Sequence, residues 1–187
     1  PSENFAQDGV YSVVVSSKDT AGNVPENTAD TIAISFAVDT NAPTLPLITG
    51  LENSIVKADS VEVTLSAMDN VMLSSITVYL NGEILNSWTD INSYSGEWKF
   101  TIPAGLEQAV RIVVVDMTGN TLDTDSEGFT SGYSCNRTIT VSTNAFLRLY
   151  ANRPLFIGVV TGASILMVGG MILVILLIKK RKNKNKV

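Results

Sequence analysis

The chain has 187 residues, a formal net charge of −5, no histidine and a single cysteine, Cys135. This composition excludes an intrachain disulfide, a Cys/His zinc site and a catalytic Ser-His or Cys-His pair. Residues 1–154 hold all 18 Asp and Glu residues against seven Lys and Arg, a net charge of −11. We therefore expect no binding of nucleic acid through neutralised phosphates.

Short runs of alternating apolar and polar residues dominate residues 1–143, and a period of two is typical of half-buried β-strands. The predicted strands contain Tyr11–Val15, Ile32–Val38, Val61–Ala67, Ile76–Leu80, Trp98–Ile102, Val110–Val114 and Ile139–Val141. Asn81-Gly82 lies between two apolar runs and predicts a type I′ hairpin turn, because both residues tolerate positive φ. This part of the chain is expected to be all-β.

A five-residue pattern, D-x-x-G-N, occurs at Asp19–Asn23 and again at Asp116–Asn120. The two copies lie 97 residues apart, which is close to the length of one immunoglobulin-like β-sandwich. The spacing predicts the C-terminal part of a truncated module at residues 1–40. A proline-containing linker at 41–46 and a complete β-sandwich at 47–143 then follow.

The same residues resemble bacterial Ig-like repeat domains of cell-surface proteins and adhesins. The matching patterns are D-G-x-Y-x-V-x-V at Asp8–Val15, D-x-A-G-N at Asp19–Asn23 and F-x-V-D-T-x-A-P at Phe36–Pro43. The resemblance implies immunoglobulin-like β-sandwich modules on a cell surface, and it identifies no ligand. No L-P-x-T-G sorting motif precedes the apolar run near the C-terminus, which favours retention by a membrane helix over attachment to the cell wall.

Leu155–Ile178 is an uncharged run of 24 residues. As a helix it is about 36 Å long, against a hydrocarbon core of about 30 Å. Six cations follow it, including Lys179, Lys180, Arg181 and Lys182. The positive-inside rule places these cations in the cytoplasm and the acidic region outside the cell. The predicted order is a juxtamembrane segment at 144–154, a single-pass transmembrane helix at 155–178 in the cell membrane, and a basic cytoplasmic tail at 179–187.

Gly158 and Gly162 form a G-x-x-x-G step within the apolar run. Small residues at this spacing let two membrane helices approach closely, so a helix-mediated dimer is one hypothesis. Glycine is also common in membrane helices that do not associate, and a helix surrounded only by lipid is the alternative.

Asp39, Asp69, Asn70 and Asp116 are candidate calcium ligands, because carboxylate and amide oxygens suit a hard cation. Turn chemistry alone also explains the D-x-x-G-N pattern, since Asp accepts hydrogen bonds from the following backbone and Gly and Asn tolerate positive φ. Calcium is therefore kept as an alternative, and no other cofactor is expected.

Trp88 and Tyr94 lie in the polar stretch 86–96 and are candidates for an exposed face that stacks on a carbohydrate ligand. Trp98 begins an alternating run with Phe100 and Ile102, so we expect its ring in the core.

Asp123, Asp125 and Glu127 crowd one loop without a basic or aromatic substrate platform nearby, and we expect them to be solvated rather than catalytic. The chain begins at Pro1 without a signal peptide, which predicts that it is the C-terminal part of a longer exported protein. The expected function is the non-enzymatic stalk and anchor of a bacterial adhesin that meets a protein or glycan through its N-terminal region. The alternative is the spacer and anchor of an extracellular hydrolase whose catalytic domain lies upstream.

Overall fold

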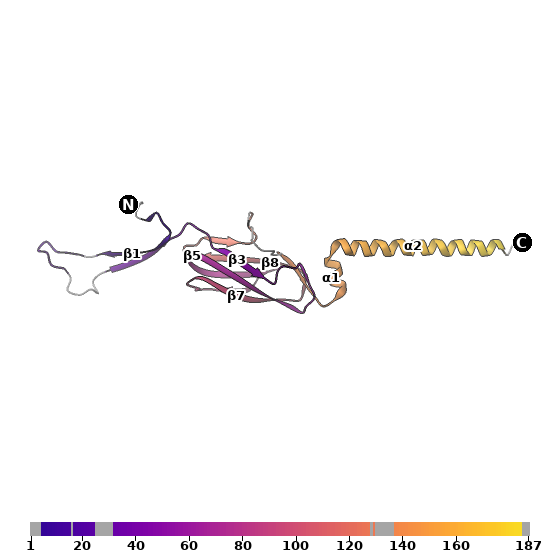
Figure 1. The fold of residues 1–187 in the computed structure, drawn as a ribbon, viewed down its shortest axis with the longest axis horizontal. Coiled ribbons are helices and arrows are strands. Elements are labelled where there is room, and N and C mark those ends of the chain that lie inside the picture. Colours follow the sequence, from indigo (N-terminus) through magenta and orange to yellow (C-terminus); the bar gives the residue numbers. More distant parts are fainter. Residues whose placement is uncertain (1–4, 16, 25–31, 128, 130–136, 185–187) are drawn as a thin grey trace.

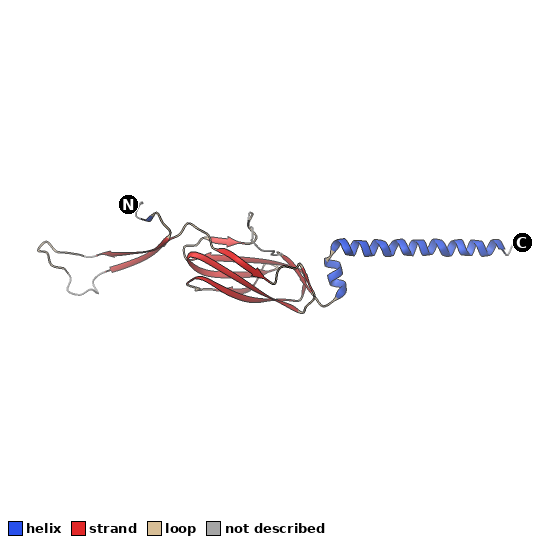
Figure 2. Cartoon of the chain, viewed as in Figure 1, coloured by secondary structure: helices blue, strands red, loops and turns tan. Residues whose placement is uncertain are grey.

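The computed structural model describes residues 5–15, 17–24, 32–127, 129 and 137–184. A two-stranded hairpin, an eight-stranded sheet, a short helix and a long helix follow one another along the length of the molecule (Figure 1). The hairpin and the long helix lie at opposite ends of the molecule, with the curled sheet between them (Figure 2). The predicted β-rich region with a C-terminal helix is confirmed.

The elements have the following bounds. The described strands are β1 Gly9–Val15, β2 Ile32–Val38, β3 Thr44–Thr49, β4 Ile55–Val56, β5 Ser60–Leu80, β6 Glu83–Trp88, β7 Ser93–Pro103, β8 Gly105–Asp116, β9 Thr121–Asp123 and β10 Thr138–Val141. The described helices are α1 Ala145–Ala151 and α2 Arg153–Lys184.

The hairpin of β1 and β2 carries one apolar face. Tyr11 lies opposite Phe36, and Val13 lies opposite Ile34, so the larger side chains alternate onto the same side. The rings of Tyr11 and Phe36 stack with centroids 5.6 Å apart, and Phe5 packs edge-on against both. Val13 and Ile34 remain 39% and 55% exposed, because a two-stranded ribbon buries little surface.

The 21-residue strand β5 joins two groups of strands around one core. Its first half pairs with β3 and β7, and its second half pairs with β6 and β8. β10 extends the second group, antiparallel to β8 and parallel to β4. Since β5 continues through both groups with a register shift between Met68 and Leu73, the strands form one curled sheet instead of the two separate layers that were expected.

The apolar positions of the alternating runs in β5, β7, β8 and β10 face this core, as their parity predicts. The largest fully buried side chains are Leu51, Leu65, Leu73, Ile76, Ile102, Ile112, Ile139, Val63, Val71, Val78, Val114 and Val141. Leu51 lies between β3 and β4, the others come from both halves of β5 and from β7, β8 and β10, and a single cluster joins all of them except Val71.

The predicted hairpin turn at Asn81-Gly82 is confirmed. Leu80 pairs with Glu83, and the two central residues adopt φ of 54° and 86°, as a type I′ turn requires. Asn81 also exchanges hydrogen bonds with the backbone of Ala109, which joins this turn to β8.

β3 begins at Thr44, inside the segment that was predicted as a linker. Pro46 favoured a linker over a strand there, because proline cannot donate a backbone hydrogen bond to a neighbouring strand. Among the described strands it pairs with β5 alone, and its register shifts between Thr44 and Leu47, so Pro46 lies where an edge strand tolerates it.

Helix α1 was not predicted, and it joins the sheet to α2. Asn144 caps it, because its side-chain Oδ1 accepts hydrogen bonds from Phe146 N (2.8 Å) and Leu147 N (3.4 Å). Within α2, Arg153–Ile178 is long and apolar enough to cross a bilayer, and its most apolar stretch is not buried against the rest of the described chain.

Candidate functional site

The repeated D-x-x-G-N pattern forms the same turn twice. In the first copy Asp19 N donates to Asn23 O (3.0 Å), while Asn23 N and Nδ2 donate to the two carboxylate oxygens of Asp19 (2.7 Å each). The matching bonds between Asp116 and Asn120 measure 3.1, 2.9 and 2.7 Å. The glycine of each copy adopts a φ of 95° or 97°, a conformation that favours glycine. Turn chemistry therefore accounts for the pattern itself.

The second turn also holds the segment that leaves the hairpin. The Nδ2 group of Asn120 lies 3.2 Å from the backbone oxygen of Asp39 and 3.0 Å from that of Asn41, and donates to both. Both residues follow the end of β2. A side chain of the curled sheet therefore satisfies two carbonyl groups of the connection to the hairpin.

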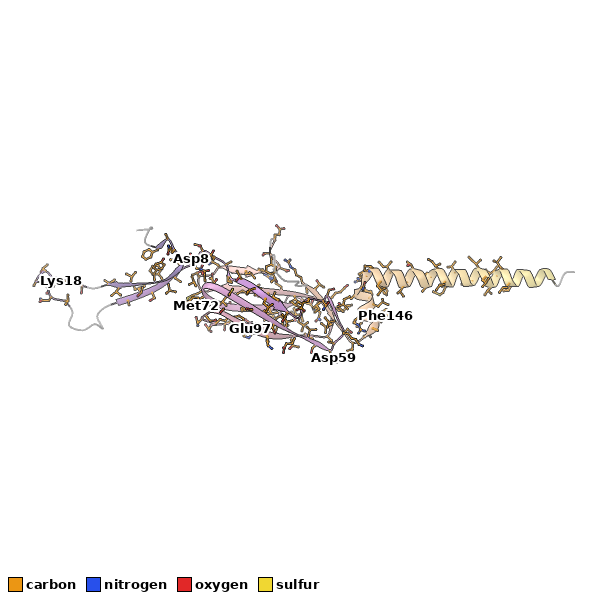
Figure 3. All side chains as sticks on the ribbon, viewed as in Figure 1. Asp8, Lys18, Asp59, Met72, Glu97 and Phe146 are labelled. Carbon is orange, nitrogen blue, oxygen red and sulfur yellow. The ribbon has the colours of Figure 1, made fainter. Side chains whose placement is uncertain are left out.

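Asp8, at the start of the hairpin, contacts the same connection between the hairpin and the curled sheet, which we call the junction (Figure 3). Its carboxylate accepts hydrogen bonds from Thr40 N (3.1 Å), Asn41 Nδ2 (2.5 Å) and Asn70 Nδ2 (3.2 Å). Loss of solvent raises the pKa of Asp8, but these hydrogen bonds outweigh that effect and leave its pKa below the ordinary value. Asn70 belongs to β5, so the hairpin is tied to the curled sheet by charge-assisted hydrogen bonds.

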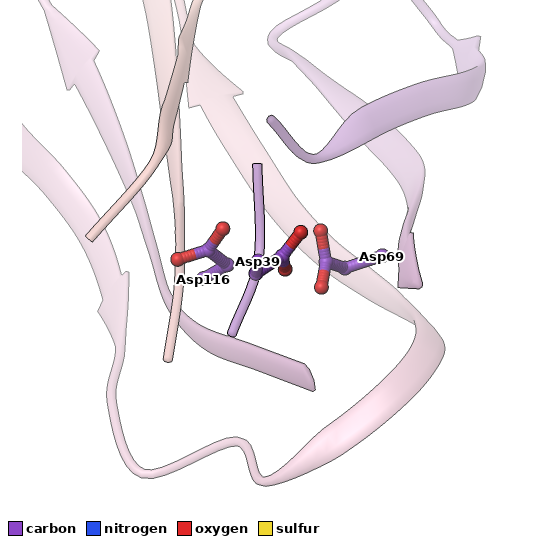
Figure 4. A group of neighbouring side chains, drawn as sticks. All are labelled: Asp39, Asp69 and Asp116. Atoms are coloured by element: carbon purple, nitrogen blue, oxygen red, sulfur yellow. The ribbon is translucent and has the colours of Figure 1, made fainter. Parts of the chain in front are cut away.

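Three carboxylates meet beside this network. One oxygen each from Asp39, Asp69 and Asp116 lies within 4.8 Å of the other two, although the residues come from the linker, β5 and the end of β8 (Figure 4). Oδ1 of Asp69 accepts hydrogen bonds from Val71 N and Met72 N (2.9 and 2.8 Å). The Oδ2 atoms of Asp39 and Asp69 are buried and have no hydrogen-bond partner among the described residues.

The electrostatics of the three carboxylates are unequal. Burial raises the pKa of Asp39, hydrogen bonds from Asn41 and Asn70 only partly offset this, and the charges of Asp69 and Asp116 raise it further. Burial also opposes ionisation of Asp116, but hydrogen bonds from Asn120 and Thr118 outweigh it and lower its pKa. Three carboxylates therefore lie close together, and the hydrogen bonds to Asp39 do not fully compensate for the cost of ionising it there.

This arrangement fits one divalent cation. Calcium binds carboxylate oxygens at about 2.3–2.6 Å, so two ligands of one ion are at most about 5 Å apart. The separations within the cluster satisfy this limit. A cation would also supply the missing partner of the two buried Oδ2 atoms.

The structure brings together three of the four predicted calcium ligands. Asp39, Asp69 and Asp116 contribute carboxylates, whereas the amide nitrogen of Asn70 donates to Asp8 and Asp39 and orients them. Sequence reasoning missed the contribution of Asp8, which begins the D-G-x-Y pattern and lies 62 residues from Asn70. No local spacing could have revealed that contact.

Trp88 and Tyr94, the predicted stacking residues, lie in different surroundings. Trp88 is paired with Ile76 and packs against the core, because its position on β6 points inward. Trp98 also packs against the core, as predicted. Tyr94 is 54% exposed and lines a pocket of about 540 Å³ together with Met68, Asp69 and Asn70. The pocket adjoins the carboxylate cluster, which Asp69 shares.

An ion pair joins β8 to the last residue of β9, where the acidic cluster of Asp123, Asp125 and Glu127 begins. Arg111 donates to both carboxylate oxygens of Asp123, with a shortest distance of 2.6 Å. The hydrogen bond from Arg111 lowers the pKa of Asp123. A carboxylate held ionised in this way is suited to a structural contact and not to general acid catalysis.

The remaining predicted residues lie in or beyond α2. An added Cβ at Gly158 or Gly162 would meet no atom within 4 Å, so this face of the helix is free within the described part of the chain. The backbone of Lys179, Lys180, Arg181 and Lys182 continues the helix to Lys184. Cys135 falls outside the described residues.

No protein-family model matches the chain, and no curated protein matches its sequence.

Proposed function

We propose that the chain is a non-enzymatic spacer and membrane anchor of a bacterial cell-surface protein of the adhesin type. In this proposal, immunoglobulin-type modules are joined in line, and calcium at the carboxylate cluster stiffens the joint. The spacer keeps the ligand-binding region of such a protein away from the bilayer.

The junction between the hairpin and the curled sheet is the observation that carries this proposal. Asp8, Asp39 and Asn41 from the hairpin side meet Asn70 and Asn120 from the sheet side through directional hydrogen bonds. A flexible connection needs no such network. A joint with fixed geometry is what an extended spacer requires.

The strand pairing supports an immunoglobulin-type module. The curled sheet wraps one core between the group β3, β5 and β7 and the group β5, β6, β8 and β10, and an immunoglobulin-type module likewise has one core between two strand groups. The recurrence of one turn geometry at Asp19–Asn23 and Asp116–Asn120 supports a second, related module that includes the hairpin.

Charge and length support a single membrane crossing. Arg153–Ile178 is long enough to span the hydrocarbon core, and six cations follow it while all 18 carboxylates precede it. The positive-inside rule then places the curled sheet outside the cell.

A pair of cysteine variants tests this orientation in intact bacterial cells. In a Cys135→Ser background, Asn53→Cys lies in an exposed loop of the curled sheet, and Asn183→Cys lies in the basic tail. A membrane-impermeant maleimide should label Asn53→Cys in intact cells and Asn183→Cys only after lysis. The reverse pattern, or recovery of the chain from the soluble fraction, would contradict the proposal.

A further inference from the structure

We propose that a pocket between the curled sheet and the two helices binds the phosphate headgroup of an anionic phospholipid in the outer leaflet. The inference rests on the proposed membrane anchor, because it requires the start of α2 to lie at the bilayer surface. It adds to that proposal a specific lipid contact at the extracellular end of the helix.

The pocket is formed where the three parts meet. It has a volume of about 390 Å³ and is lined by Ile55, Lys57, Ala145, Arg148, Leu149, Asn152 and Leu155. Leu155 is the first residue of the uncharged apolar run, so this side of the pocket is at the boundary of the hydrocarbon core. The volume falls within the roughly 300–1,000 Å³ of sites that bind small molecules.

Two cations of the lining lack an acidic partner among the described residues. The ion pairs found there are Lys99–Glu62, Arg111–Asp123 and Arg153–Glu107, and none involves Lys57 or Arg148. Arg148 Nη1 donates to the backbone oxygen of Ser142 (2.8 Å), which fixes the guanidinium at the edge of the sheet. Its other N–H groups are suited to phosphate oxygens, and Lys57 is exposed beside them.

No acidic side chain among the described residues lines the pocket. Glu107 pairs with Arg153 at 2.9 Å, and Arg153 also lies over the Tyr150 ring at 4.0 Å. Asp59 lies at the same end of the sheet (Figure 3), but it accepts from Thr143 Oγ1 and does not line the pocket. The pocket is therefore a basic site on a region whose net charge is −11.

Apolar and aromatic neighbours match the rest of a phospholipid. Leu149 and Leu155 line the pocket beside the two cations and are suited to the glycerol and upper acyl carbons. The ring of Phe156 packs edge-on against Phe146 and Tyr150, with centroids 6.2 and 5.3 Å apart. Tyr150 in this cluster has the kind of amphipathic ring that is enriched at the headgroup level. A free phosphate ion would use the cations but not this apolar side.

Headgroup-specific quenching tests the site in the full chain. A fluorophore is placed on Asn53→Cys in a Cys135→Ser background, two residues from Ile55, and the protein is reconstituted in phosphatidylcholine vesicles. Spin-labelled phosphatidylglycerol should quench this fluorophore more strongly than spin-labelled phosphatidylcholine at the same mole fraction. The preference is the affinity for phosphatidylglycerol relative to phosphatidylcholine, obtained from the two quenching curves. Lys57→Gln/Arg148→Gln should reduce this ratio by roughly fivefold for each cation removed.

Matched controls separate this site from the basic tail. Lys179→Gln/Lys180→Gln removes two charges at the opposite leaflet and should leave the preference unchanged. Excess soluble glycerol phosphate should not compete. Equal quenching by both lipids, loss of the preference in the tail variant, or full competition by glycerol phosphate would overturn the proposal.

Folding and anchoring are measured in the same samples. If Arg148→Gln unfolds the protein, Lys57→Gln alone should still weaken the preference, because Lys57 is exposed and has no ion pair among the described residues. Flotation with the vesicles reports the anchor separately. A chain that floats without lipid preference contradicts only the headgroup site, whereas a chain that does not float contradicts the membrane anchor.

Discussion

The side-chain amide of Asn120 donates to the backbone oxygen of Asp39, a residue 81 positions earlier in the chain. The same amide donates to Asp116 Oδ2 at 2.7 Å, so one side chain completes the repeated turn and holds the linker. The first copy of the turn has the same internal bonds. Asn120 differs from Asn23 in its two bonds to the linker and in one further bond, to Thr118 Oγ1 at 3.0 Å.

Replacement of Asn120 should therefore destabilise the protein more than replacement of Asn23. Asn120→Ala removes bonds to the turn and to the linker, with an expected loss of about 2–3 kcal/mol, whereas Asn23→Ala removes turn bonds alone, about 1 kcal/mol. Urea denaturation of both variants measures the difference. Equal losses would show that the linker bonds contribute nothing to the stability of the junction.

Calcium should raise the melting temperature of the full chain. With a dissociation constant near that of extracellular modules, 10 mM calcium corresponds to about 1.4–2.7 kcal/mol of added stability. Asp39→Asn should abolish this response, and Asp90→Asn, an exposed site with positive φ that Asn tolerates, should retain it. Melting curves that are identical in calcium and in chelator would rule out the cation site.

The raised pKa of Asp39 predicts a specific pH dependence in chelator. A carboxyl group whose folded pKa lies above its unfolded value contributes stability at low pH, and this contribution is lost as pH rises through the folded pKa. Asp39→Asn removes the unfavourable charge. The variant should therefore match the parent at low pH and become more stable than the parent as pH rises. A constant difference across the pH range would contradict the raised pKa.

Both tryptophans should contribute to the stability of the curled sheet. Trp88 and Trp98 pack against the core but remain partly exposed, so each Trp→Ala change should destabilise by about 2–3 kcal/mol, less than the roughly 3–5 kcal/mol of a fully buried ring. Tyr94→Ala, at an exposed position, should change stability by at most about 0.5 kcal/mol. If a denaturant titration shows no loss of unfolding free energy for Trp88→Ala, the Trp88 ring does not pack against the core.

Local sequence patterns predicted most of the strands and one turn. The alternation in Val61–Ala67 and Ile76–Leu80 identified both halves of β5, and Asn81-Gly82 identified the turn that follows. The patterns did not predict that the two halves form one continuous strand, because its bend depends on contacts with β7 and β8. Pairing with β5 likewise overrode the local preference of Pro46 in β3.

The carboxylate cluster was only partly predictable. Its residue types suggested oxygen ligands, but Asp39, Asp69 and Asp116 meet only after the linker folds back onto the curled sheet. Helix α1 has seven residues, too few for an amphipathic stripe to be recognised, and its capping residue Asn144 was the only local signal.

In the proposed function, calcium fixes the hairpin on the curled sheet. Spin labels on Ser12→Cys in β1 and Glu97→Cys in β7, in a Cys135→Ser background, report the distance between the two parts by pulsed electron paramagnetic resonance. Both positions are exposed. We predict one narrow distance distribution in calcium, a broad one in chelator, and a broad one in both conditions for Asp116→Asn. A distribution that is broad in calcium, or unchanged by chelator, would contradict the account.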